Sequence, residues 1–349
     1  MSDLPGQAAD FSRPNRILKL ARRPVGIPVL ADWRIVEEPV RAPVLGECVV
    51  TVDHISIDPA MRGWINDVSS YVPTVRIDQV MRALGVGRVV QSRNDRLPVG
   101  TVVQGLLGVQ RFAVIDGQWL NSVDESLGSA RSHLGILGQT GFTAYFGLFS
   151  VGKPIAGDTV VVSAAAGAVG SVVGQLARLA GCRVIGVAGG PEKCRFIREE
   201  LGFDGAVDYK TENVQEALRE LCPTGIDVYF DNVGGLVLEA ALANLALHAR
   251  LVICGAISQY NAKVAMPGPS NLWQLLVKRA VMEGFLVIDH TDNFPVARAR
   301  LSKWLRHDNL RELETVVQGD VDDFPEVLLD LFRGDNVGKL VLTLDSRNY

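Results

Sequence analysis

The stretch VVSAAAGAVGSVVGQLA, residues 161–177, decides the fold. It begins as an apolar strand, passes through a turn of small residues and ends with the composition of a helix. A strand that leads directly into a helix leaves the first helical amides unpaired, and a phosphate can reach them only where side chains are absent. The stretch therefore predicts a turn whose bare backbone binds a charged diphosphate.

The small residues of this turn match the dinucleotide fingerprint GxGxxG incompletely. Ala165, Gly167 and Gly170 take the three glycine positions, so the first glycine is replaced by alanine. Gly174, one turn further on, would let the helix lie close to the sheet. An ordinary strand–helix turn of small residues is the alternative interpretation. The position of the turn after the first strand of an alternating unit favours dinucleotide binding.

Predicted strands and helices alternate regularly around and after this turn. The expected strands are 159–163, 183–187, 206–208, 227–231, 250–254 and 284–288. The expected helices are 169–180, 191–201, 213–221, 236–247, 271–279 and 295–307. Because parallel strands need such crossover helices, the alternation predicts an α/β fold with a doubly wound parallel sheet covered on both faces.

The chain before about residue 125 has a different character. Short runs rich in β-branched residues are separated by Gly, Pro, Asn and Asp, at 47–52, 87–91, 101–105 and 111–115. This pattern predicts a small barrel or a partly open sheet. The strand-like tail 338–344 is expected to return to it. We therefore predict a first domain over 1–128, completed by 310–349, and a second over 129–309.

The composition excludes several classes of protein. The chain has 349 residues, 48% of them hydrophobic and 21% charged, and a net charge of −4. Without a basic stripe we expect no nucleic-acid partner, and without a run of about 18 apolar residues we expect no membrane partner. Residues 1–16 lack the apolar core of a signal peptide. The five cysteines are scattered and form no CxxC pair, which favours a cytoplasmic protein.

The end of the second predicted strand indicates which dinucleotide is bound. An NAD site usually places Asp or Glu there to hold the ribose hydroxyls, but this strand ends Val-Ala-Gly-Gly at residues 187–190. Lys193 follows in PEKCR. The missing acid and the nearby cation favour the 2′-phosphate of NADP(H). A solvated lysine is the alternative, although the first turn of a helix is an unfavourable place for a cation.

These motifs together resemble a known family. AAAGAVGSVVGQLA, AGGPEKCRF, DYK, YFDNVGG, CGAISQYN, EGF and GDNVGK follow one another at matching spacings, and NRILKLARRPVGIP and DPAMRGW extend the match towards the N-terminus. They resemble the zinc-independent medium-chain dehydrogenases/reductases, and within them the NADP-dependent alkenal/one double-bond reductases, which include prostaglandin and curcumin reductases. The resemblance implies a GroES-like β-barrel domain, a Rossmann domain and a homodimer.

The resemblance also implies a set of cofactor contacts. They comprise Gly167, Ala168, Val169, Gly170 and Ser171 at the pyrophosphate; Lys193 and Tyr209 at the 2′-phosphate; Asn232 in the cofactor groove; Cys254, Gly255, Ala256, Ile257, Ser258 and Tyr260 on the nicotinamide side; Phe285, Leu286 and Val287 at the nicotinamide ring; and Asn336 from the tail. Fold rules agree, because Asn232, Ser258, Tyr260 and Phe285 lie at or beyond the C-terminal ends of parallel strands, where open α/β sheets bind ligands.

The expected reaction is NADPH-dependent reduction of the C=C bond of an enone or alkenal. Hydride delivered to the β-carbon makes the carbonyl oxygen an enolate, which needs a hydrogen-bond donor. Tyr260 is the catalytic candidate, either directly or by holding the ribose hydroxyl, and water could equally protonate the α-carbon. The family often reads DPYMR where this chain has Ala60, so Tyr71 is the substitute that we expect at the substrate.

Other chemistries have weaker support. The five histidines are scattered and the zinc-ligand patterns are absent, so we expect no metal site. A quinone reductase on the same fold is the nearest rival. A protein that holds NADPH without turnover is the rival from another class, and a zinc alcohol dehydrogenase is a more distant one.

Overall fold

The computed structural model describes residues 14–67, 70–264 and 266–345, which form two compact units. The first takes the described residues of 1–134, 316–331 and 340–349, and the second takes those of 135–315 and 332–339. This division differs from the predicted domains at residues 129–134, which lie in the first unit, and at 310–315 and 332–339, which lie in the second. The N-terminal stretch in which we expected no signal peptide lies largely outside the described residues.

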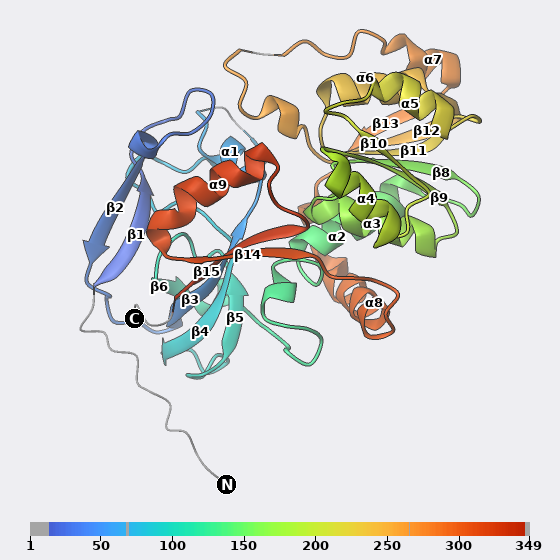
Figure 1. Ribbon diagram of the computed structural model, residues 1–349. Coiled ribbons are helices and arrows are strands. Elements are labelled where there is room, and N and C mark those ends of the chain that lie inside the picture. Colours follow the sequence, from blue (N-terminus) through green and yellow to red (C-terminus); the bar gives the residue numbers. More distant parts are fainter. Residues whose placement is uncertain (1–13, 68–69, 265, 346–349) are drawn as a thin grey trace. The chain divides into compact units, whose positions relative to one another are not determined.

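The second unit is built on a six-stranded parallel sheet with the order β10-β9-β8-β11-β12-β13. Its strands are β8 (Thr159–Ser163), β9 (Arg183–Ala188), β10 (Gly205–Asp208), β11 (Ile226–Asp231), β12 (Leu245–Ile253) and β13 (Val281–Gly284). Its helices are α2 (Gln139–Phe146), α3 (Ala168–Leu179), α4 (Pro191–Glu199), α5 (Val214–Leu221), α6 (Gly235–Ala243), α7 (Trp273–Lys278) and α8 (Phe294–Arg306). Helices α3 and α4 cover one face and α5, α6 and α7 the other (Figure 1). The predicted doubly wound sheet is confirmed.

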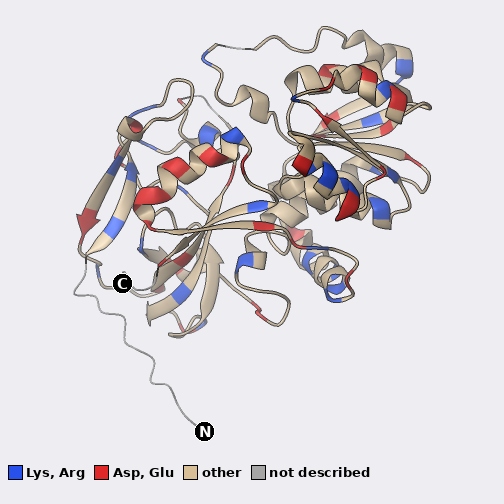
Figure 2. Ribbon diagram, viewed as in Figure 1, with Lys and Arg blue, Asp and Glu red and all other residues tan. Residues whose placement is uncertain are grey.

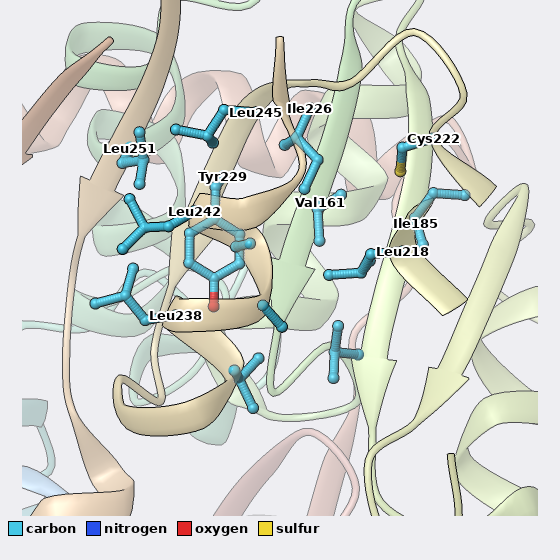
Figure 3. Packing of buried hydrophobic residues seen from close by; sticks show 14 of the residues in the cluster. Val161, Ile185, Leu218, Cys222, Ile226, Tyr229, Leu238, Leu242, Leu245 and Leu251 are labelled. Carbon is cyan, nitrogen blue, oxygen red and sulfur yellow. The ribbon is translucent and has the colours of Figure 1, made fainter. Parts of the chain in front are cut away.

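The order in which successive strands are added to the sheet reverses between β8 and β11, which is where open α/β sheets form a ligand crevice. One face of these strands is sealed by an apolar cluster in which Tyr229 lies among Leu238, Leu242 and Leu251 (Figure 3). Each such leucine contributes about 1.5–3 kcal/mol when buried. The core therefore fixes the strands firmly, and the turns at their C-terminal ends start from defined positions.

The predicted bounds of several elements of this unit differ from the structure, most clearly for β13, for α6 and for β12, which begins at Leu245 rather than 250. The last strand is Val281–Gly284 rather than 284–288, because the more apolar run after Gly284 enters the 3₁₀ turn Val287–Asn293. Helix α6 ends at Ala243 rather than 247, since Asn244 donates its Nδ2 to Ala240 O at 2.9 Å and the next residue already begins β12. In both cases the local apolar content of the sequence did not show where the element ends.

The first unit is a seven-stranded sheet with the order β14-β15-β3-β4-β5-β7, to which β6 adds by pairing with β3, and a separate ribbon of β1 and β2. Its strands are β1 (Asn15–Leu20), β2 (Trp33–Glu38), β3 (Glu47–Ile57), β4 (Gly85–Ser92), β5 (Val102–Gly105), β6 (Phe112–Asp116), β7 (Asn121–Ser122), β14 (Glu314–Gly319) and β15 (Lys339–Leu344); its helices are α1 (Ala60–Trp64) and α9 (Phe324–Arg333). Residues Leu340–Thr343 pair antiparallel with β3, so the predicted return of the tail is confirmed.

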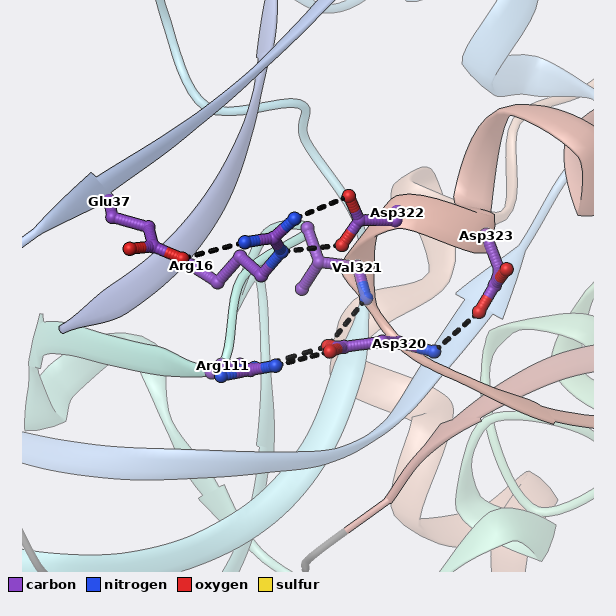
Figure 4. Close-up of polar contacts among 7 residues, drawn as sticks. All are labelled: Arg16, Glu37, Arg111, Asp320, Val321, Asp322 and Asp323. Carbon is purple, nitrogen blue, oxygen red and sulfur yellow. Dashed lines mark hydrogen bonds and ion pairs between the residues drawn. The ribbon is translucent and has the colours of Figure 1, made fainter. Parts of the chain in front are cut away.

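A polar network ties the segment before α9 to the β1–β2 ribbon and to Arg111, the residue before β6 (Figure 4). Arg16 Nε and Nη2 donate to the two oxygens of Asp322 at 2.5 and 2.7 Å. Arg111 pairs in the same way with Asp320. The Arg16 guanidinium holds the pKa of the Asp322 carboxyl below its usual range. Because the Arg16 and Asp322 side chains are 29% and 42% exposed, solvent screening keeps this pair worth about 1 kcal/mol at most.

Charge is mixed along the chain. Figure 2 shows Lys and Arg interspersed with Asp and Glu over the described part of both units. Among the residues that the structure describes, none of the helices combines the length and the apolar composition that crossing a bilayer requires.

Candidate active site

The turn after β8 leaves the first amides of α3 without intrahelical partners, at the place where the sequence predicted a phosphate site. The first i to i−4 hydrogen bond of α3 runs from Ser171 N to Gly167 O at 3.0 Å, so the amides of Ala168, Val169 and Gly170 precede it. A Cβ on Gly170 would lie 2.3 Å from Ala164 O, a distance that real Cβ atoms do not reach. Only glycine lets α3 start this close to the turn, so these residues fit a pyrophosphate.

The sequence predicted that Gly174 lets α3 lie close to the sheet. In the structure the group that lies close to Gly174 is the side chain of Phe203. A Cβ there would lie 1.8 Å from the ring of Phe203, which precedes β10. A Cβ on Gly186 of β9 would lie 2.5 Å from the Ile197 side chain and 3.0 Å from the same Phe203 ring. The two glycines therefore let α3 and β9 close around Phe203 and hold the helix start in place.

The end of β9 leaves space beside Gly190, where the adenosine 2′-phosphate is predicted to bind. Gly190, the residue before α4, has φ +96°, and a Cβ there would meet nothing within 4 Å. The ring of Tyr209, 48% exposed, lies beside Gly189. The sequence did not reveal a nearby carboxylate, that of Asp208. It accepts hydrogen bonds from Gly190 N at 2.7 Å and Lys210 N at 3.0 Å, which hold its pKa below the usual range.

Lys193 is not the solvated side chain of the alternative interpretation. Its Nζ donates to Gly334 O at 2.5 Å and Asn336 O at 2.6 Å, so it connects α4 to the tail. Burial lowers the pKa of Lys193, and the charge of Lys210 adds to this while Asp335 opposes it. An ammonium has three donors, and two are used here. The two carbonyl bonds therefore hold the Lys193 ammonium beside the end of β9.

The tail lies directly against the phosphate turn. Gly338 N donates to Ala166 O at 2.8 Å, and the two segments form a parallel bridge between Gly167 and Gly338. The side chain of Asn336 is buried and donates its Nδ2 to Gly338 O at 2.8 Å. Asn336 is therefore near the predicted cofactor contacts, but in this structure its amide shapes the tail itself.

A buried network follows β11. Asn232 donates its Nδ2 to Ser163 O and its backbone amide to Ser163 Oγ, both at 2.8 Å. The carboxylate of Asp231 accepts from Ser163 Oγ and from the Tyr229 hydroxyl at 3.0 Å. We call Ser163, Tyr229, Asp231 and Asn232 the Asp231 network. Only Asn232 was predicted; the polar residues inside the apolar strand ends were the available signal.

The loop after β12 brings Tyr260 back over its own beginning. The Tyr260 hydroxyl accepts from Ala256 N at 3.3 Å, and a Cβ on Gly255 would lie 3.1 Å from it. Ser258 Oγ donates to Val233 O at 2.6 Å. Burial raises the pKa of Cys254 to about 12, which makes that thiol inert at neutral pH. The loop therefore offers the Tyr260 hydroxyl and backbone, not a reactive cysteine.

The predicted residues beyond β13 are used mainly for packing. The Phe285 ring meets Phe230 edge-on with centroids 6.5 Å apart, and a Cβ on Gly147 would lie 2.6 Å from it. Val287 is buried, whereas Leu286 is half-buried. These residues lie at the expected sheet edge, but the Phe285 ring serves the core of the unit. Any contact with a nicotinamide would have to come from its edge or from the backbone.

Tyr71 belongs to the first unit, whereas the residues described above belong to the second. It is 52% exposed and lies in an open hollow with Val72, Pro73, Thr74 and Arg76. Ala60, where the family often has tyrosine, begins α1 in the same unit. A substrate role for Tyr71 stays a prediction.

The histidine and cysteine side chains do not form a metal centre in the described part of the chain. Within it, no three His, Cys, Asp or Glu side chains are grouped so that they could hold an ion. His54 Nδ1 is 3.0 Å from Thr343 Oγ1, and burial lowers the pKa of His54 to about 4. His54 therefore belongs to the pairing of β3 with β15.

A doubly wound sheet with a bare turn after its first strand defines a dinucleotide-binding protein. Residues 16–123 match the family described as N-terminal domain of oxidoreductase, and residues 168–303 match the family described as zinc-binding dehydrogenase. The chain belongs to the medium-chain dehydrogenases/reductases.

Its relatives match over nearly their whole length. The NADPH-dependent curcumin reductase of Escherichia coli is 39% identical, over 94% of this chain and 96% of that protein. The NADP(+)-dependent 2-alkenal reductase of Nicotiana tabacum is 36% identical, over 94% and 97%. The crystal structure of CurA in complex with NADPH from Vibrio vulnificus has a TM-score of 0.90 and 40% identity, over 95% of this chain and 99% of that chain. The predicted family and fold are confirmed.

Proposed function

We propose that the chain is an NADPH-dependent reductase of the C=C bond of α,β-unsaturated ketones and aldehydes. The observation that carries this proposal is the match, over nearly the whole chain, to an NADPH-dependent curcumin reductase and an NADP(+)-dependent 2-alkenal reductase. A 2-alkenal is by definition an α,β-unsaturated aldehyde. The site agrees with these names, because its turn fits a pyrophosphate and its second strand end offers Lys193 instead of a free carboxylate.

The residues of the second unit have distinct roles in this proposal. The first amides of α3, with Gly167 and Ser171, hold the pyrophosphate, and Lys193 and Tyr209 hold the 2′-phosphate. Bound NADPH supplies the hydride for the β-carbon of the substrate. The Tyr260 hydroxyl supports the developing charge on the carbonyl oxygen, directly or through a ribose hydroxyl. A preorganised donor of this kind contributes about 3 kcal/mol to transition-state stabilisation.

The remaining predicted residues complete the cofactor site. The Asn232 side chain and the loop from Cys254 to Tyr260 lie at the ends of β11 and β12, towards the nicotinamide. Beyond β13, the residues Phe285, Leu286 and Val287 line the nicotinamide ring. Asn336 holds the tail over the turn that follows β8. Tyr71 contributes to the substrate side from the first unit.

Oxidation of NADPH with a panel of acceptors tests the proposal. We expect turnover with 2-alkenals and open-chain enones, with the saturated carbonyl as the product. A clear preference for quinones would select a quinone reductase instead. Tight binding of NADPH without turnover on any acceptor would select a protein that only holds the cofactor.

The proposed reaction needs no zinc. The support is the absence, within the described ranges, of a group of three His, Cys, Asp or Glu that could bind an ion. The description zinc-binding dehydrogenase belongs to the matched family as a whole. Metal analysis of active protein and assay in the presence of a chelator test this. Stoichiometric zinc whose removal abolishes turnover would contradict it.

A homodimer and a cytoplasmic location complete the proposal. Strand β13 ends the sheet order, and Val281 is 58% exposed there, while Trp273 and Leu276 of α7 are 68% and 61% exposed. A second copy would cover these apolar residues, and light scattering should then give twice the chain mass. All five cysteines are free thiols, which fits a reducing compartment. Fractionation of the source cells tests the location.

A further inference from the structure

One oxygen of a buried carboxylate organises the end of β11. Asp231 is 1% exposed, and its Oδ1 accepts hydrogen bonds from Ser163 Oγ, the Tyr229 hydroxyl, Val233 N and Gly234 N, each at 3.0 Å. A carboxylate without water is tolerated only where donors of this kind surround it. The donors come from β8, from β11 and from the turn that follows β11. The side chain therefore fixes this turn to both strand ends.

The same turn carries the next loop by backbone hydrogen bonds. Asp231 O accepts the amides of Cys254 at 2.9 Å and Gly255 at 3.1 Å. Asn232 O accepts Ile257 N at 3.2 Å. The carbonyl of the following residue, Val233, accepts Ser258 N at 3.2 Å. The loop that ends in Tyr260 is thus built directly on the turn that Asp231 fixes.

We propose that Asp231 is the positioning residue of the nicotinamide side. Its carboxylate sets the turn 232–234, this turn sets the loop 254–258, and the loop sets the place of the Tyr260 hydroxyl. The inference rests on the proposed function for its catalytic consequence. Because the first amides of α3 are placed by Gly167 and Gly170 instead, the two halves of the cofactor should respond differently when the carboxylate is changed.

The test is Asp231→Asn, which keeps the size and one acceptor oxygen but removes the charge. In the cofactor-free protein, hydrogen exchange of the amides in 232–234 and 254–258 should rise about tenfold, while exchange in 167–171 stays as in the parent. Hydride transfer to an enone in a single turnover should slow by about 10- to 100-fold, because small displacements in an active site cost that much. The Kd for NADPH should change by less than about threefold, equivalent to about 0.7 kcal/mol.

Asp158→Asn is the matched control. Asp158 is also buried and also lies at an end of β8, but before the strand, where it accepts from Ile155 N at 3.0 Å and pairs with Arg250 at 2.6 Å. We expect a lower Tm with unchanged exchange at 254–258 and unchanged hydride transfer. Tyr229→Phe removes one donor from Asp231 and should give the same pattern as Asp231→Asn, with about a third of its free-energy change in exchange and in hydride transfer.

Three outcomes would overturn the inference. Exchange that rises equally at 167–171, or hydride transfer at the parental rate with a Tm lowered as in Asp158→Asn, would make Asp231 a structural residue only. If Asp231→Asn does not fold, Tyr229→Phe decides, and parental exchange at 254–258 together with parental transfer in that variant rejects the inference. A parent protein that binds NADPH but reduces no enone would reject the proposed function alone, since the exchange measurement needs no turnover.

Discussion

The turn after β8 and the loops after β11 and β12 lie at one edge of one sheet, yet they are built in opposite ways. The first is formed by leaving side chains out, so that Gly170 can approach Ala164 and the first amides of α3 have no intrahelical partner. The second is formed by burying polar groups, with Asp231 joined to Ser163 and to the backbone that follows. Bare backbone suits a charged diphosphate that must come close. A hydrogen-bonded network suits a reacting ring whose position matters to a fraction of an ångström.

The largest expected effect comes from filling the bare turn. In Gly170→Ala the new Cβ would lie 2.3 Å from Ala164 O, so the start of α3 must shift away from the turn. We expect NADPH to bind at least about 100-fold more weakly, or about 2.7 kcal/mol, by calorimetry. Gly268→Ala is the control, because a Cβ there meets nothing within 4 Å. Parental affinity in Gly170→Ala would show that the turn does not hold the cofactor.

The opposite side of the comparison is probed by Tyr260→Phe. Removal of the hydroxyl should lower kcat by about 100-fold while the Kd for NADPH stays within about twofold, because the donor acts on charge that develops only during reaction. Tyr145→Phe, at a hydroxyl that pairs with Arg300 in the same unit, should leave kcat unchanged. If Tyr260→Phe keeps parental turnover, water or the cofactor's ribose supports the oxygen and the residue has no catalytic role.

Lys193→Ala tests a side chain that has two proposed roles, contact with the 2′-phosphate and anchoring of the backbone at Gly334 and Asn336. We expect the preference for NADPH over NADH to fall about tenfold through loss of the 2′-phosphate contact. NADH itself should also bind about threefold more weakly, because the tail segment Gly334–Asn336 loses its anchor. Lys210→Ala, at an exposed neighbour, should change both values less. Equal losses for the two cofactors would leave Lys193 as a tail anchor only.

The smallest expected effect is on pH dependence. Burial lowers the pKa of Lys193 from 10.5, so its positive charge is lost at a lower pH than that of an ordinary lysine. The preference for NADPH should therefore decline as the pH rises, starting below 10.5. The charge of Lys210 contributes to the lowered pKa, so Lys210→Ala should move the decline to higher pH. Measured ratios of the two Kd values that stay constant over this range would contradict the assignment.

The sequence was informative wherever a feature is local. The alternation of elements, the small residues of the turn and the family motifs predicted the doubly wound sheet, the two-part fold and the family. Gly170 could be predicted because a glycine is recognised from the residue itself, without knowledge of its contacts in the fold. The predicted bounds of β13 and α6 were wrong. Pairing with β12, not local apolar content, decides where β13 lies, and the early start of β12 beside β11 ends α6.

Features made by distant residues could not be predicted in the same way. Ser163 and Asp231 are 68 residues apart in the chain, and Lys193 and Gly334 are 141 apart, so no local pattern relates them. Phe285 was assigned from the family resemblance, but its ring packs on Phe230, which the sequence could not show. Strand order brings such residues together, and the sequence predicted strands without their hydrogen-bond partners.

Calorimetric titration of the unmodified protein with NADPH and then with NADH tests the central claim most directly. The bare turn and Lys193 together predict saturable binding of NADPH, tighter than that of NADH. Equal affinities would reject the phosphate contact of Lys193. No heat and no change in fluorescence with either nucleotide would contradict the account as a whole.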